Sequence, residues 1–197
     1  MKSAQRSRLV LVAFALAAFA LVGCGPAPWS SAPSGAASPS GTVVPTPVPN
    51  DLSSGTTQRE VVAGAVTATV DYWSTLSMDR WTPDAVKPVS LSMTTAVTPA
   101  DGQKVYLQKA TMLAVPSSAT ETFPALDPQV DSSTVSPGYL VLAPYSFSQT
   151  FNVGPVPAET TFVTLQFTYD FLVQTTPTSS DYAKQTATDT LTIAVAG

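Results

Sequence analysis

The chain has 197 residues, a formal net charge of −4, no histidine and one cysteine. The absence of histidine excludes a Ser–His–Asp triad and histidine-ligated zinc or copper, and a single cysteine excludes an internal disulfide. Hydrophobic residues make up 44% of the chain and charged residues 11%, which favours a packed core over a solvated, disordered polymer. The acidic balance argues against nucleic-acid partners.

The first 24 residues have the pattern of an export signal that ends at the cysteine. Basic residues come first, at Lys2, Arg6 and Arg8, and an uncharged apolar run follows from residue 9 to residue 22. This run is shorter than the roughly 20 apolar residues that a membrane-spanning helix needs. A basic start followed by a short apolar run is typical of a cleaved signal peptide.

The residues that close this run, Leu21, Val22, Gly23 and Cys24, resemble the lipobox of bacterial lipoproteins. The resemblance implies removal of a signal peptide at 1–23, a new N-terminus at Cys24 and a diacylglycerol on the Cys24 sulfur, with palmitate as a typical acyl chain. It also implies a location at the extracytoplasmic face of the cell membrane. Several acyl chains, at about 0.8 kcal/mol per buried methylene, make such an anchor effectively permanent. The alternative is an uncleaved signal anchor with an incidental cysteine.

The composition of the segment that follows the cysteine predicts a tether. Residues 25–58 are dominated by Pro, Ser, Ala, Gly and Thr and show no hydrophobic period, so we expect a disordered linker over 24–58. A flexible chain of this length averages roughly 30–35 Å from end to end, and its prolines extend it further. The linker would therefore hold a domain away from the lipid surface.

From Arg59 onward the sequence predicts strands. Six segments alternate apolar and polar residues with a period of two, the pattern of strands that bury one face. They cover residues 66–73, 89–94, 105–115, 145–153, 163–173 and 190–195. The stretch 116–142 is broken by prolines and predicts short edge strands. Turn residues at 98–103 predict a tight hairpin, and 74–79 could form one short helical turn.

These patterns predict seven to nine antiparallel strands in a domain that spans residues 59–197. That number is typical of a two-sheet β-sandwich, so we expect an all-β fold of the immunoglobulin-like kind. The resemblance to immunoglobulin and fibronectin type III domains is one of architecture only, because the Cys–Trp–Cys core is absent. A small closed barrel is the alternative, and the proline-broken middle argues against it.

The strongest candidates for ligand contacts lie in and beside the first long connection. Trp73 falls on the polar phase of its strand, and Trp81 follows eight residues later. One interpretation is that both rings pack under the connection as a small satellite core. The other is an exposed platform for a sugar ring or a peptide, with polar contacts from Asp79, Arg80 and Asp84.

Carboxylate pairs also occur, Asp79 with Asp84 and Asp127 with Asp131. Neither pair has the dense Asp, Asn and Gly spacing of a calcium loop, so we expect no metal and no cofactor. A pair of carboxylates could also serve glycoside hydrolysis. No other residue pattern supports catalysis, so a hydrolase is the least favoured hypothesis.

We therefore expect a non-enzymatic lipoprotein, attached to the membrane through the lipid on Cys24, whose domain binds or supports a protein of the cell envelope. The alternative is a carbohydrate- or cell-wall-binding module that uses Trp73 and Trp81. Both hypotheses require the same fold and the same location.

Overall fold

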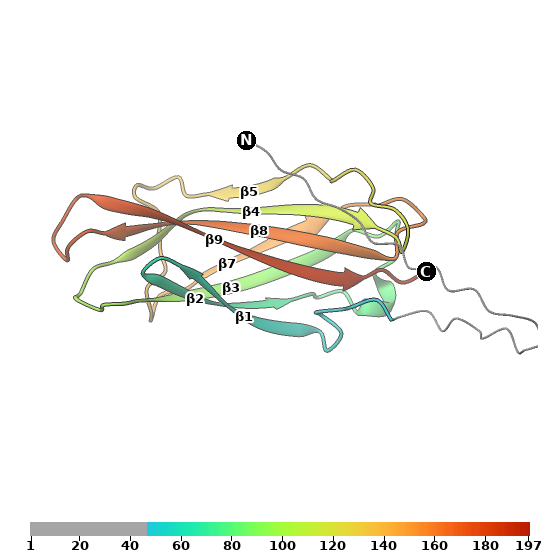
Figure 1. Cartoon of the computed structure of the whole chain (residues 1–197), viewed down its shortest axis with the longest axis horizontal. Helices are drawn as coiled ribbons and strands as arrows, with labels where there is room; N and C mark the ends of the chain where they lie inside the picture. The colour runs from blue at the N-terminus through green and yellow to red at the C-terminus, as the bar shows by residue number, and fades with distance from the viewer. Residues whose placement is uncertain (1–46) are drawn as a thin grey trace, which may run out of the picture. The chain divides into compact units, whose positions relative to one another are not determined.

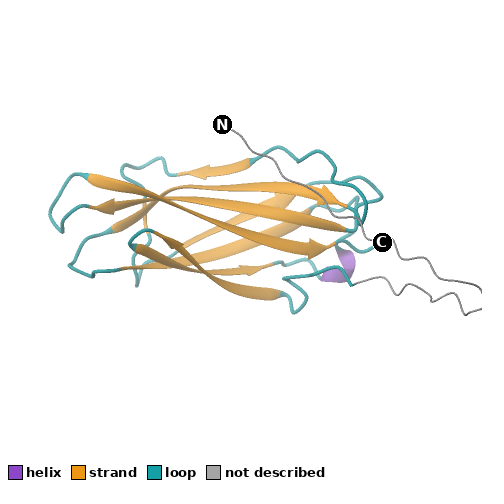
Figure 2. Ribbon diagram, in the orientation of Figure 1, coloured by secondary structure: helices purple, strands orange, loops and turns teal. Residues whose placement is uncertain are grey.

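The computed structural model describes residues 47–197. The signal peptide, Cys24 and most of the expected tether lie outside the described residues. The described part is all-β, with two antiparallel sheets that face each other across one core (Figures 1 and 2). Within residues 47–197, no helix is long and apolar enough to cross a membrane.

Nine strands form the two sheets. Sheet 1 has the order β1 (Thr56–Ala63), β2 (Val66–Trp73), β3 (Lys87–Val97) and β7 (Phe147–Val153). Sheet 2 has the order β5 (Gln129–Ser132), β4 (Val105–Ser117), β8 (Phe162–Gln174) and β9 (Tyr182–Ala194), and β6 (Tyr139–Leu140) also pairs with β4. All six strands expected from the period-two pattern are present. Two separate sheets confirm the sandwich and exclude the closed barrel.

The path of the chain is that of an immunoglobulin-like sandwich. The chain passes from sheet 1 to sheet 2 after β3, returns after β6 and passes to sheet 2 again after β7; β3 neighbours β7 while β4 neighbours β8. Strands B, C, E and F of immunoglobulin domains have the same relation to one another. In this correspondence β2 and β9 take the places of strands A and G, β5 and β6 lie beside β4, and β1 is an additional edge strand.

Two sequence-based boundaries need correction. Residues 98–103 do not form a hairpin but carry the chain from sheet 1 to sheet 2, because β4 pairs with β8 and not with β3. A period-two pattern shows which face of a strand is buried, but not which strand lies beside it.

The domain also starts before Arg59, because β1 begins at Thr56 and Leu52 is completely buried. The start of β1 has the polar composition of the expected tether, because two of the four inward-facing residues of the strand, Thr57 and Arg59, are polar.

A polar contact crosses the centre of the apolar core. Tyr72 on β2 and Tyr169 on β8 are both fully buried, and their hydroxyl oxygens are 2.8 Å apart. The Tyr72 hydroxyl donates to the Asp189 carboxylate on β9 at 2.9 Å, which leaves its oxygen to accept from Tyr169. Burial raises the pKa of Tyr72 and of Tyr169 above the ordinary value, so both hydroxyls stay protonated as donors. Tyr169 is therefore a core residue, as its position in the alternating run predicts.

The tyrosine pair gives a test of how the sheets are held together. Tyr72→Phe leaves the buried Tyr169 hydroxyl without its acceptor, so we expect a loss of about 1–3 kcal/mol in the free energy of unfolding. Tyr169→Phe keeps the bond from Tyr72 to Asp189 and should cost less. In urea unfolding, the double variant should lose less than the sum of the two single losses. Strictly additive losses would show that the two hydroxyls do not interact.

Candidate functional site

The connection between β2 and β3 holds four of the five expected contact residues, and it buries the largest of them. Trp81 is completely buried, and its indole Nε1 donates a hydrogen bond to Ser74 Oγ at 3.2 Å. The backbone carbonyl of Trp81 accepts a hydrogen bond from Ala196 N at 2.9 Å. Trp81 thus ties the connection to the C-terminal end of the chain. The expectation of a platform built from both tryptophans is wrong, because Trp81 has no exposed face.

The charged candidates lie on the same connection and do not line a groove with Trp73. Asp79 and Arg80 belong to the short 3-10 turn η1 (Met78–Arg80), and both are exposed, as is Asp84. Among the described residues, none of these three side chains takes part in an ion pair. None of them lines the groove beside Trp73. The structure therefore separates the acidic and basic candidates from the aromatic one.

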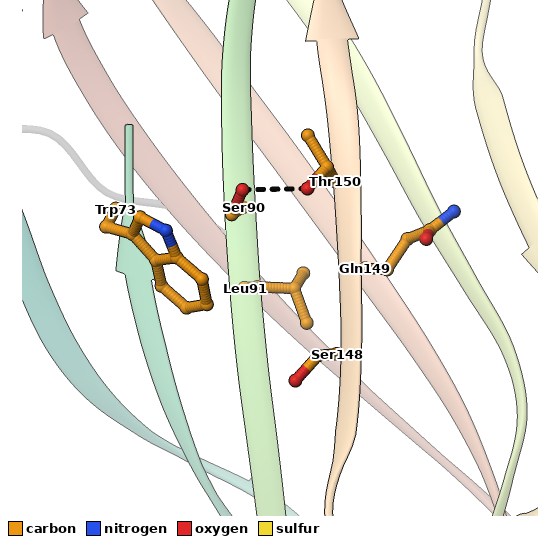
Figure 3. A pocket seen from close by; sticks show the side chains of 6 residues that line it. All are labelled: Trp73, Ser90, Leu91, Ser148, Gln149 and Thr150. Atoms are coloured by element: carbon orange, nitrogen blue, oxygen red, sulfur yellow. Dashed lines mark hydrogen bonds between the residues drawn. The ribbon is translucent and has the colours of Figure 1, made fainter. Parts of the chain in front are cut away.

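Trp73 forms one wall of a shallow groove on the outer face of sheet 1 (Figure 3). The groove has a volume of about 220 Å³ and runs from β2 across β3 to β7; besides Trp73, its lining residues are Ser90, Leu91, Ser148, Gln149 and Thr150. Ser90 lies directly beside Trp73 in the strand register, and its hydroxyl is 2.8 Å from the Thr150 hydroxyl. Small side chains next to a large ring create the depression. The lining has no charge, and an aromatic face beside hydroxyl groups suits a sugar ring or a polar peptide.

A buried lysine at the start of β3 holds the neighbouring loops. Lys87 is completely buried, and its Nζ lies 2.6 to 3.3 Å from four backbone carbonyl oxygens, those of Thr82, Pro83, Ala85 and Gly154. Burial lowers the pKa of Lys87 below its ordinary value, and the charge of Asp84 opposes this shift. The sequence contained a signal for this role, because Lys87 has the same phase as the buried Val89 and Leu91. The carbonyl cage makes Lys87 a structural residue.

The outer face of sheet 2 carries a second polar cluster that the sequence did not suggest. Asp170 on β8 is almost fully buried and lies 3.2 Å from Lys109 Nζ and 3.1 Å from Lys184 Nζ. The Thr186 hydroxyl donates a hydrogen bond to Asp170 Oδ1 at 2.8 Å. Burial raises the pKa of Asp170, but the bonds from Thr186, Lys184 and Lys109 outweigh it, so the pKa is lower than the ordinary value. The three partners come from two strands on either side of β8, which is why no local motif reveals the cluster.

A second groove lies at the end of the sandwich that carries the β1–β2, β3–β4 and β8–β9 connections, which we call the loop end. It has a volume of about 300 Å³ between the last residues of β3, the β3–β4 connection and the segment before β7; its lining residues are Thr95, Ala96, Val97, Ala100, Gly102, Gln103, Leu142 and Ala143. Most of these side chains are small or apolar. In residues 47–197, no group of three or more His, Cys, Asp or Glu side chains is arranged to hold a metal ion.

The Asp170 cluster predicts a pH dependence of stability. Because the folded state lowers the pKa of Asp170, its contribution is fully present above the unfolded value of about 3.9 and is lost as the pH falls through the folded value. We expect Asp170→Asn to reduce the free energy of unfolding by about 1.5–3 kcal/mol at pH 7. The difference in the free energy of unfolding between the variant and the wild type should become smaller below about pH 4. Chemical unfolding from pH 3 to 8 measures this, and a difference that stays constant would contradict it.

No family model matches the chain, and no curated protein or solved structure is detectably similar to it. The immunoglobulin-like character of the domain therefore rests on its strand order. The function has to be argued from the surfaces that this fold presents.

Proposed function

We propose that the chain is a lipoprotein, anchored in the cell membrane at Cys24, that displays a non-enzymatic immunoglobulin-like domain on the extracytoplasmic side to bind a protein of the envelope. The lipobox pattern at residues 21–24 supports the anchor. The position at which the tether joins the domain supports display, and it is the observation on which the proposal mainly rests.

The described chain enters the domain at the end opposite to the β1–β2, β3–β4 and β8–β9 connections. Asp51 N donates to Thr192 O at 2.8 Å, so the described chain enters beside the C-terminal end of β9 (Figure 1). At the other end, the turn between β1 and β2 contacts the β3–β4 connection through Thr98 N and Ala65 O at 2.9 Å. Lys104 N in that connection donates to Gln174 Oε1 at the last residue of β8, 2.9 Å away. The groove of about 300 Å³ thus lies at the end of the sandwich away from Asp51, where the described chain enters.

The anchor is tested by changing the cysteine. Cys24→Ser should leave the precursor uncleaved and unlabelled by a palmitate analogue, because the lipid requires the sulfur atom. Gly23→Ala is the matched control, since it keeps a small residue before the cysteine and should be processed normally. Gel mobility, metabolic labelling and protease accessibility on intact cells measure the three parts of the proposal. Normal cleavage and labelling of Cys24→Ser would refute the anchor.

A second candidate function, binding of a cell-wall glycan, is favoured by the groove at Trp73. The ring is half-buried on a face that is otherwise rich in Ser and Thr. The volume of about 220 Å³ suits one sugar ring stacked on the indole, with its hydroxyls near Ser148 and Thr150. This site uses Trp73 alone, without the Trp81 ring.

Trp73→Ala separates the glycan function from the protein-binding function. If the groove binds a glycan, this variant should lose at least about tenfold in retention on purified cell-wall polysaccharide, because stacking on the ring supplies most of the contact area. Its unfolding midpoint should change little, since the ring is not part of the core. Thr69→Ala, on the same strand and the same face, is the control. Equal retention of wild type and Trp73→Ala would remove the glycan candidate.

A further inference from the structure

In residues 47–197 the sandwich has five edge strands, because β5 and the two-residue β6 share one edge of sheet 2, and β7 differs from the other four. Natural sheets protect their edges with charged residues, prolines or short strands, because an unprotected edge pairs with other chains. β1 carries Arg59 and Glu60, β9 carries Lys184 and Asp189, and β5 has only four residues, one of them Asp131. The seven residues of β7, Phe147–Val153, include no charge and no proline. Within the described chain, β7 is therefore the least protected edge.

The hydrogen-bonding pattern shows which backbone groups of β7 face outward. Pro88 lies opposite Asn152, and its carbonyl accepts from Ser74 Oγ on the β2 side at 2.6 Å. Asn152 N donates to Gln129 Oε1 at 3.0 Å, away from β3. Because backbone groups alternate along a strand, the N–H and C=O groups of Ser148 and Thr150 also point away from β3. In the part of the chain that the structure describes, these outward groups have no backbone partner.

The chain itself places one peptide-like group in the position of a next strand. The Gln129 carboxamide accepts from Asn152 N and donates to Asn152 O. A carboxamide offers the same acceptor and donor as the peptide group of a neighbouring strand. Gln129 thus completes the ladder at Asn152, and the ladder continues without a partner to Thr150 and Ser148. The groove on the outer face of sheet 1 begins at these same two residues.

We propose that the free edge of β7 is the docking site for an extended segment of a partner protein, which adds to sheet 1 as a fifth strand. This inference rests on the proposed protein-binding function and names its site. The backbone groups of Ser148 and Thr150 supply the ladder, and Gln129 sets where the added strand ends. The segment needs free peptide N–H groups at alternate positions, which excludes proline there. Small or hydroxyl side chains on its outer face match the uncharged groove beside Trp73.

The test uses the full-length chain and peptides selected from a displayed random heptapeptide library. Ser148→Pro removes an outward N–H without touching the ladder to β3. Ser148→Ala is the matched control, because the Ser148 side chain makes no hydrogen bond within residues 47–197. Selected peptides should bind wild type and Ser148→Ala equally, and Ser148→Pro at least about tenfold more weakly. Binding should also slow amide exchange at Ser148 and Thr150. Gln129→Ala should strengthen binding, because it frees the ladder position at Asn152.

Three results would overturn the inference. One is a selection that yields no peptide with a dependence on the Ser148 N–H. Another is equal binding of the selected peptides to Ser148→Pro. The third is a concentration-dependent dimer in sedimentation that Ser148→Pro dissociates, because it would assign the edge to a second copy of this chain. None of these results affects the Cys24 test, so failure of the docking site and failure of the membrane anchor remain distinguishable.

Discussion

The contact between Tyr72 and Tyr169 fixes how the two sheets lie against each other. Apolar packing is not directional, so many relative positions of two apolar sheet faces would bury similar areas. A buried hydroxyl that loses its partner costs about 1–3 kcal/mol, which penalises any position that separates the two rings. The Phe167 ring, 5.1 Å from Tyr72 between the ring centres, packs against the same contact. Aromatic packing and the Tyr169–Tyr72–Asp189 hydrogen bonds thus connect the two sheets, as an inter-sheet disulfide does in antibody domains.

The open sides of the sandwich are held by polar contacts between the sheet edges. On one side, Asp51 pairs with Thr192 through both its backbone N–H and its carboxylate, and the carboxylate also binds Arg59 at 2.7 Å. On the other side, Gln129 from sheet 2 binds the backbone of Asn152 in sheet 1. Each contact satisfies edge groups that would otherwise face solvent or another chain. Each contact covers only a small part of its sheet edge, however, and Gln129 reaches β7 only at Asn152.

The sequence predicted the strands well because their signal is local. Each of the six expected segments shows its buried phase within its own residues, as Val163 to Val173 does in β8. Pairing and sheet membership are set by contacts far apart in the chain, so the sequence could not show that residues 98–103 change sheets. The same limit applies to the site. The interpretation that both tryptophans pack under the connection is confirmed for Trp81 but not for Trp73. The contacts that bury Trp81 were not visible locally, because one of its partners, Ala196, lies more than a hundred residues away.

The end at which the described chain enters and the direction of β7 together restrict how a partner can approach. β7 runs from the loop end toward the end where the chain enters, because Phe147 pairs with Met93 and Val153 pairs with Lys87. A strand added antiparallel to it would therefore run from the end where the described chain enters toward the end that carries the β3–β4 connection. Its C-terminal continuation would then pass close to the 300 Å³ groove, whose residues Leu142 and Ala143 directly precede the turn into β7. A partner held at the β7 edge could thus reach the loop-end groove without any change in the sandwich, which would let one extended segment use both surfaces.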